Sequence, residues 1–180
     1  MAGTGLYWGH GEDGLRALAE ALRAPVFLNG LGRGCLPADH ELYYSRARGA
    51  ALSGADVAVV VGTPLDFRLG FGASFAEDAK LIMVDVASPE RSYPRPVDAE
   101  LCGEVGEILT GLAAAGGAGP SREQWLDGLR AIEDEKRAAE RAELGDSRAP
   151  LHPMRVYGEL AQVLDRDAIV AGSDEVRARE

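Results

Sequence analysis

The loop at residues 62–72 carries residue types that suit the binding of an anion. It combines Gly62 and further glycines with Thr63, Asp66 and Arg68, directly after an apolar run. Glycines let backbone N–H groups approach a phosphate, and an arginine can bind the same anion through two parallel hydrogen bonds. The alternative is a structural loop in which Arg68 pairs with Asp66 or another carboxylate. The residues therefore indicate either an anion-binding loop or an internally paired one.

Two acidic residues come after other apolar runs. Asp85 closes the run at residues 80–84, and Glu104 comes after Gly103 and a short run at residues 100–102. An acid at the end of such a strand can accept hydrogen bonds from ribose hydroxyls, and Glu104 could accept an adenine amino group. The alternatives are that Asp85 caps the next turn and that Glu104 is the first-turn carboxylate that a helix favours.

The remaining candidate motifs do not form a catalytic set. Gly3 and Gly5 open a Gly-x-Gly-x-x-x-Gly pattern that nearly matches a dinucleotide-binding fingerprint, but no strand precedes it. A second glycine pattern at residues 30–34 leads to Pro37 rather than to the start of a helix. The three histidines share no metal-ligand spacing, and no strand leads into Ser74 as a nucleophile elbow requires. We therefore expect no catalytic residue and no metal site in this chain.

Short apolar runs alternate with helical patterns, and these elements must position the candidate residues. The run at residues 57–61 is a sequence of valines and alanine rather than an alternation of apolar and polar residues. Strands of this kind are buried on both faces, as in parallel sheets covered by helices. Further strands are predicted at residues 25–29, 81–84 and 100–102, and helices at residues 12–23, 41–54 and 104–114.

The predicted fold class is α/β: a Rossmann-like, doubly wound, mostly parallel sheet of about five strands, with a C-terminal helical extension. In such a sheet, ligands bind in the crevice beyond the carboxyl ends of the strands. A first strand is expected to end near residues 3–8, so the domain is expected to begin part-way through that strand. We assign residues 1–115 to this domain and residues 116–180 to a linker helix and a further segment.

The second segment begins with a capping box at residues 121–124 that opens a long helix. Its first half carries an apolar stripe that includes Trp125, which we expect to pack on the chain's own domain rather than on a partner chain. The charge-rich run at residues 133–143 is expected to be a solvated helix face. A helix at residues 154–164 and a strand at residues 168–171 are predicted after it.

Composition and charge exclude several functional classes. The 180 residues contain 19 Lys and Arg against 29 Asp and Glu, which gives a net charge of −10. Such a field repels nucleic acid and anionic lipid, so we expect neither as a partner. There is no apolar run long enough to span a membrane and no signal-peptide pattern. We expect a cytoplasmic protein with two unpaired cysteines.

Two segments carry a family resemblance. Residues 25–40, with the loop Gly-Arg-Gly-Cys-Leu-Pro-Ala-Asp-His, and residues 55–68, with Gly-Thr-Pro-Leu-Asp-Phe-Arg after a strand, resemble the middle of thiamine-diphosphate-dependent enzymes. The similarity is to acetolactate synthase and its acyl-CoA lyase cousins, such as oxalyl-CoA decarboxylase. It implies a central domain that holds FAD, an ADP moiety or nothing. The contacts that the resemblance implies are Gly3, Gly5, Asn29, Arg48, Gly62, Thr63, Asp66, Arg68, Asp85 and Glu104.

The same resemblance sets limits on activity. Family members also have a first domain with a catalytic glutamate and a third domain that binds the thiamine diphosphate through magnesium, so thiamine diphosphate and Mg²⁺ are implied only if such domains are supplied. The resemblance makes residues 116–180 the linker helix and the truncated start of that third domain. We therefore interpret the chain as a truncated, acetolactate-synthase-like fragment that is catalytically inactive alone. The alternative is an independent binding module for an ADP-containing cofactor, FAD or CoA. A homo-oligomer or a partner chain stays open.

Overall fold

The computed structural model describes residues 1–116, 119, 121–166 and 168. These residues divide into two compact units, Met1–Glu135 and Lys136–Glu180. The elements in chain order are α1 (Thr4–Trp8), α2 (Glu12–Leu22), η1 (Gly30–Gly32), α3 (Arg48–Gly54), β1 (Val57–Val61), η2 (Phe67–Gly72), β2 (Lys80–Asp85), β3 (Ala99–Cys102), α4 (Val105–Ala115), α5 (Glu123–Leu144) and α6 (Pro153–Val163).

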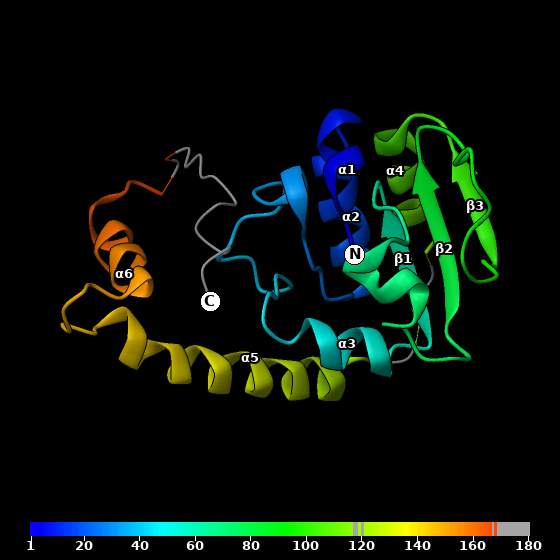
Figure 1. Ribbon diagram of the computed structural model, residues 1–180. Helices are drawn as coiled ribbons and strands as arrows, with labels where there is room; N and C mark the ends of the chain where they lie inside the picture. Colours follow the sequence, from blue (N-terminus) through cyan, green and yellow to red (C-terminus); the bar gives the residue numbers. More distant parts are fainter. Residues whose placement is uncertain (117–118, 120, 167, 169–180) are drawn as a thin grey trace. The chain divides into compact units, whose positions relative to one another are not determined.

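The first unit contains a parallel sheet in the order β1-β2-β3, whose strands all point to one end (Figure 1). Single bridges extend the sheet beyond β1: Ala2 pairs with Val61 and with Leu28, and Val26 pairs with Tyr43. The α/β class and the parallel sheet are therefore confirmed. The described residues contain three strands rather than about five, because the segments around Ala2 and Val26 pair through isolated bridges only.

Helices and loops bury both faces of this sheet. One apolar cluster joins Val61 and Val84 to buried side chains of α2, α4 and α5. A second cluster joins Val60 and Leu81 to Leu52 of α3 and to the loop after β1. Successive valines of β1 thus enter different clusters, which explains why the strand has no polar alternation.

The predicted helix positions hold for α2 and α4 but not for α3. α2 ends at Leu22, where Arg23 adopts a left-handed conformation with φ of 48°. Helix was predicted from residue 41, but α3 begins only at Arg48, because Tyr43 is in a bridge with Val26 and Tyr44 N donates to Val26 O. Residues 4–8, expected at the end of a first strand, form the short helix α1 instead.

The first half of α5 packs on the α/β unit. Leu126 and Leu129 are buried, and Trp125 packs against the same apolar cluster, so the expectation that this stripe covers its own domain is confirmed. Residues 134–143 are exposed or half-buried, as the solvated-face prediction requires, but Glu133 departs from it because its side chain is fully buried. The division between the two compact units falls inside α5, after Glu135.

The second unit contains the end of α5 and α6. α6 covers the predicted helix to within one residue, and Arg155 Nε donates to Glu159 Oε1 over 2.6 Å along it. Gly158 lies close to the end of α5, since a methyl group there would be 2.5 Å from Leu144 O. The strand predicted at residues 168–171 falls, apart from Ala168, outside the described residues.

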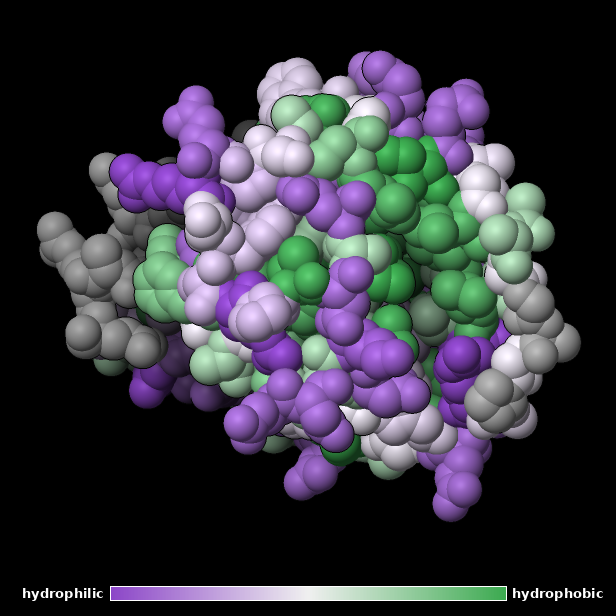
Figure 2. All heavy atoms as spheres, turned by 90° about the vertical axis from the view of Figure 1, so that its right-hand side faces the viewer, coloured by the Kyte–Doolittle hydropathy of each residue, from purple (hydrophilic) through white to green (hydrophobic). Residues whose placement is uncertain are grey.

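Figure 2 faces the side of the molecule where β3 lies. Hydrophobic residues gather in one area of this face, and hydrophilic residues lie above and below it. β3 is the edge strand of the sheet, and its Leu101 packs against the apolar cluster under α2 and α4. Within the described ranges, no helix is both long enough and apolar enough to cross a membrane.

Candidate functional site

The glycines at the carboxyl end of β1 bring two backbone segments into contact. Gly3 N donates to Val61 O over 2.9 Å, and Gly5 N donates to Gly62 O over 2.9 Å. Gly62 has φ of 53°, and a methyl group on it would lie 2.4 Å from Gly5 Cα. Only glycine fits there. The amides of Gly3, Gly5 and Gly62 bond within the chain, the last to Val84 O over 2.8 Å, so these glycines serve close backbone approach rather than phosphate binding.

Asn29 and Thr63 lie beside these glycines and are both buried. Their exposed fractions are 6% and 2%. The Thr63 hydroxyl is 3.3 Å from Val61 O and 3.4 Å from Asn29 Oδ1, and either oxygen can accept its proton. Asn29 Nδ2 has no hydrogen-bond partner among the described residues. A buried donor without a partner costs about 1–3 kcal/mol, so this amide is suited to an acceptor atom from outside the chain.

Asp85 and Glu104 lie at the same edge of the sheet, Asp85 at the end of β2 and Glu104 after β3. A methyl group on Gly5 would lie 3.3 Å from Asp85 Oδ1, which also accepts the Val86 amide over 2.8 Å. Gly103 N donates to Asp85 O over 3.1 Å, which brings Glu104 to this end of the sheet. Glu104 is exposed at the N-cap of α4, and its side chain makes no capping hydrogen bond. Asp85 thus bonds the amide of its own neighbour, and Glu104 lies at the N-terminal end of α4, where a helix favours a carboxylate.

Asp66 and Arg68 pair with each other on η2. Arg68 Nη2 is 2.5 Å from Asp66 Oδ2, and Arg68 Nε lies 3.1 Å from both carboxylate oxygens. This hydrogen bond from the Arg68 side chain lowers the pKa of Asp66 and raises that of Arg68. The internally paired alternative is therefore the one in the structure. Nη1 of Arg68 has no partner among the described residues.

Arg48 stands apart from the other predicted contacts. It is the first residue of α3 and is exposed, and no hydrogen bond or ion pair in the described part of the chain joins it to the carboxyl edge. The edge thus assembles Gly3, Gly5, Asn29, Gly62, Thr63, Asp85 and Glu104, with the Asp66–Arg68 pair on the adjoining loop. Across the described ranges, no group of three or more His, Cys, Asp or Glu side chains could hold a metal ion.

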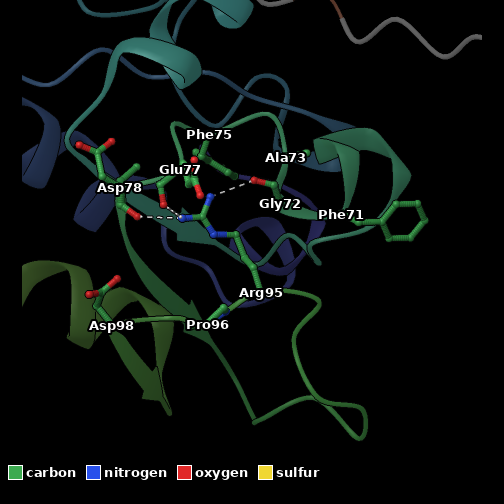
Figure 3. Close-up of a pocket in the computed structure, with 10 residues that line it drawn as sticks. Phe71, Gly72, Ala73, Phe75, Glu77, Asp78, Arg95, Pro96 and Asp98 are labelled. Atoms are coloured by element: carbon green, nitrogen blue, oxygen red, sulfur yellow. Dashed lines mark hydrogen bonds between the residues drawn. The ribbon is translucent and has the colours of Figure 1, made fainter.

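Arg95 is a structural residue of this region that the sequence did not reveal. Its Nη1 donates to Gly72 O and Ala76 O over 3.2 and 3.1 Å, and its Nη2 donates to Glu77 O and Ala79 O over 3.0 and 3.2 Å. Figure 3 shows the guanidinium directed at the segment of residues 72–79. Arg95 also lines a hollow of about 650 Å³. The arginine fixes the chain that leaves η2. No local pattern links it to carbonyls that lie 16 to 23 residues away.

A second hollow, of about 270 Å³, is mostly apolar and lies near the start of β1. It is lined by Met1, by Val57 at the start of β1 and by Trp125, among others. Neither hollow is lined by Asn29, Thr63 or Asp85. The carboxyl edge therefore lies outside both of these hollows, and it combines the buried Asn29 and Thr63 with the exposed Glu104.

Comparison with known proteins decides the family. The profile of the thiamine pyrophosphate enzyme, central domain, matches residues 1–112. The chain belongs to this family. It is 51% identical over 170 residues to the acetolactate synthase large subunit IlvG of Mycobacterium tuberculosis. It is 32% identical over 172 residues to 2-hydroxyacyl-CoA lyase 2 of Homo sapiens.

The chain spans less than a third of the relatives that it matches. The two alignments cover 94% and 91% of this chain but 31% and 27% of the relatives. An X-ray structure from Mycobacterium smegmatis, described as a thiamin diphosphate-dependent enzyme, matches with a TM-score of 0.50 and 26% identity, over 67% of this chain and 25% of that one. The family resemblance found in the sequence is thereby confirmed.

Proposed function

We propose that the first unit is the nucleotide-binding central domain of an acetolactate-synthase-like enzyme and that its carboxyl edge binds an ADP-containing cofactor. The observation that carries the proposal is Asn29, whose buried Nδ2 lacks a partner among the described residues, at the end of the sheet where such ligands bind. Its neighbours at this edge add two carboxylates, those of Asp85 and Glu104.

The residues divide the contacts to such a ligand by their chemistry. The Asn29 amide donates to a phosphate or carbonyl oxygen, and an Asp85 oxygen accepts from a ribose hydroxyl. The exposed Glu104 carboxylate accepts from an amino group of the base. Arg68 keeps Nη1 for a phosphate while Nε and Nη2 stay on Asp66. These groups fit an ADP moiety, which FAD and CoA share.

We propose further that the chain alone does not catalyse thiamine chemistry. The resemblance assigns the activating glutamate and the metal-anchored diphosphate to domains that flank the central one. The profile match covers the central domain, and the relatives are more than three times as long as the aligned part. Supplied with thiamine diphosphate, Mg²⁺ and pyruvate, the chain is therefore expected to form no acetolactate.

Thermal unfolding with ADP, FAD, CoA and thiamine diphosphate tests the binding proposal. A ligand at 100 times its Kd stabilises the folded state by about 2.7 kcal/mol, which raises Tm by roughly 5–10 °C for a chain of this size. We expect a rise with at least one of the three ADP-containing ligands, lost in Asn29→Ala, and no rise with thiamine diphosphate. An equal rise with thiamine diphosphate, or no rise with any ligand, would contradict the proposal.

An Arg68→Ala variant separates the ligands. If the Arg68 Nη1 contact reaches a phosphate, this variant lowers the Tm rise with ADP, FAD and CoA alike. A loss confined to FAD would instead assign Arg68 to the flavin half of that molecule.

A further inference from the structure

The turn at residues 45–47 surrounds a carboxylate that comes from a distant part of the chain. Glu133 Oε2 accepts the backbone amides of Ser45, Arg46 and Ala47 over 3.1, 2.7 and 2.9 Å. Its Oε1 accepts the Ser45 hydroxyl over 2.9 Å. The Glu133 side chain is completely buried, and 86 to 88 residues separate it from its partners.

Successive N–H groups that point to one atom form a concave anion receptor. A carboxylate with several N–H and O–H donors is held in its ionised form, because hydrogen bonds to the charged form favour that form. Arg46 adds a positive charge, with its Nη1 3.8 Å from Glu133 Oε1. The turn thus has the shape and charge of a binding site for one carboxylate group.

The other polar contacts between the first half of α5 and the α/β unit are weaker or more exposed. Tyr44 Oη donates to Leu126 O over 3.3 Å, and the Arg23–Glu123 pair is exposed. Arg130 lies over the Tyr44 ring, 4.1 Å from its centre. Exposed ion pairs contribute about 0–1 kcal/mol, so the buried carboxylate is the dominant polar contact. Apolar packing by Leu126 and Leu129 supplies the rest.

We propose that the turn at residues 45–47 is a carboxylate-binding site whose resident ligand is Glu133, and that the first half of α5 stays docked only while this ionised carboxylate occupies the site. The helix is a strap on the α/β unit, and its release exposes the apolar stripe that includes Trp125. The inference is independent of any nucleotide at the carboxyl edge.

The charges around Glu133 set the direction of its pH dependence. Burial raises its pKa, but the Ala47 amide, the Ser45 hydroxyl and the other two amides of the turn outweigh burial and lower the pKa to about 2. Arg46 faces it from the turn, and Arg130 and Arg137 lie one turn away on its own helix. A lowered pKa means that docking is complete above about pH 4.5 and is lost as the pH falls toward 2.

Hydrogen exchange on the full chain tests the strap. At pH 7 we expect Glu133→Gln to raise the exchange of the α5 amides at residues 126–135 at least 10-fold, while β1 amides keep their protection. Glu135→Gln is the matched control, because Glu135 is an exposed carboxylate two residues further on. The chain has two tryptophans, so Trp8→Phe leaves only Trp125. In that background, the fluorescence emission of Trp125 should shift to the red when Glu133→Gln is added.

Chemical rescue tests the claim that the turn recognises a carboxylate. In Glu133→Ala, acetate at about 100 mM should restore α5 protection, whereas the neutral acetamide should not. The proposal is overturned if α5 exchanges alike in Glu133→Gln and Glu135→Gln, if β1 loses protection together with α5, or if acetate acts no better than acetamide. Should Glu133→Ala fail to fold, the acid titration of Trp125 emission in the Trp8→Phe background replaces it, and an unchanged emission down to pH 2 overturns the proposal.

Discussion

Asn29 and Glu133 are both buried polar residues of the α/β unit, yet their surroundings differ completely. Glu133 accepts three backbone amides and one hydroxyl, and each of its oxygens has a partner. Asn29 lies at the carboxyl edge of the sheet, where its Nδ2 has no partner among the described residues and its Oδ1 is 3.4 Å from the Thr63 hydroxyl.

We propose that this difference separates a group that holds the fold together from a group that binds a ligand. A buried polar group normally finds partners, because leaving one unpaired costs about 1–3 kcal/mol. Where the chain supplies all of the partners, as for Glu133, the group fixes one segment to another. Where the chain leaves a donor unpaired at the edge at which such sheets bind ligands, the missing partner is expected from outside.

Lowering the pH should produce the largest change in unfolding free energy, because it protonates Glu133. The pKa of Glu133 is about 2 in the folded chain and near 4.5 when unfolded, so on the order of 3 kcal/mol of stability present at neutral pH is lost as the pH falls between these values. Urea unfolding of the wild type and Glu133→Gln at a series of pH values measures this. If the wild type and Glu133→Gln lose the same unfolding free energy between pH 4.5 and 2, Glu133 is not the source of the acid sensitivity.

Arg95 provides an intermediate case, since both of its Nη atoms have partners but the residue is only half-buried. Replacing it by alanine leaves four carbonyls that water can partly reach, so we expect the unfolding free energy to fall by about 1–2 kcal/mol. Arg95→Lys should recover a part of this, because one ammonium cannot reach all four oxygens. Urea unfolding at pH 7 measures the unfolding free energy of both variants. If Arg95→Ala lost as much unfolding free energy as Glu133 loses on acidification, burial would not explain the difference between these two residues.

Local pattern was enough to predict the elements that carry the sheet. The helical spacing of Leu15, Leu18 and Ala19 and the unbroken apolar run of β1 are set by neighbours in sequence and by burial on one or two faces. The carboxyl edge could be predicted from the topology of parallel sheets, which brings together the ends of separate strands. α3 was predicted too long because tertiary pairing of Tyr43 with Val26 overrode local helical propensity.

The contacts that sequence reasoning missed all join distant segments. Glu133 sits in a charged run, and only the turn at residues 45–47, brought near it by the fold, makes it a buried residue. Arg95 is likewise defined by carbonyls of the chain after η2. The glycines were predicted to let backbone amides approach a phosphate, whereas Gly5 and Gly62 pack against each other's backbone, a contact between segments that are distant in sequence.

Calorimetric titration of ADP into the full chain at pH 7 tests the central claim most directly. We expect the wild type and Arg48→Ala, whose side chain lies outside the edge, to bind with the same Kd. Asn29→Ala should bind at least 10-fold more weakly, a loss of about 1.4 kcal/mol, while its unfolding free energy changes by less than about 1 kcal/mol, since Thr63 keeps Val61 O as an acceptor. Equal affinity in Asn29→Ala and the wild type, or no binding by the wild type, would contradict the account.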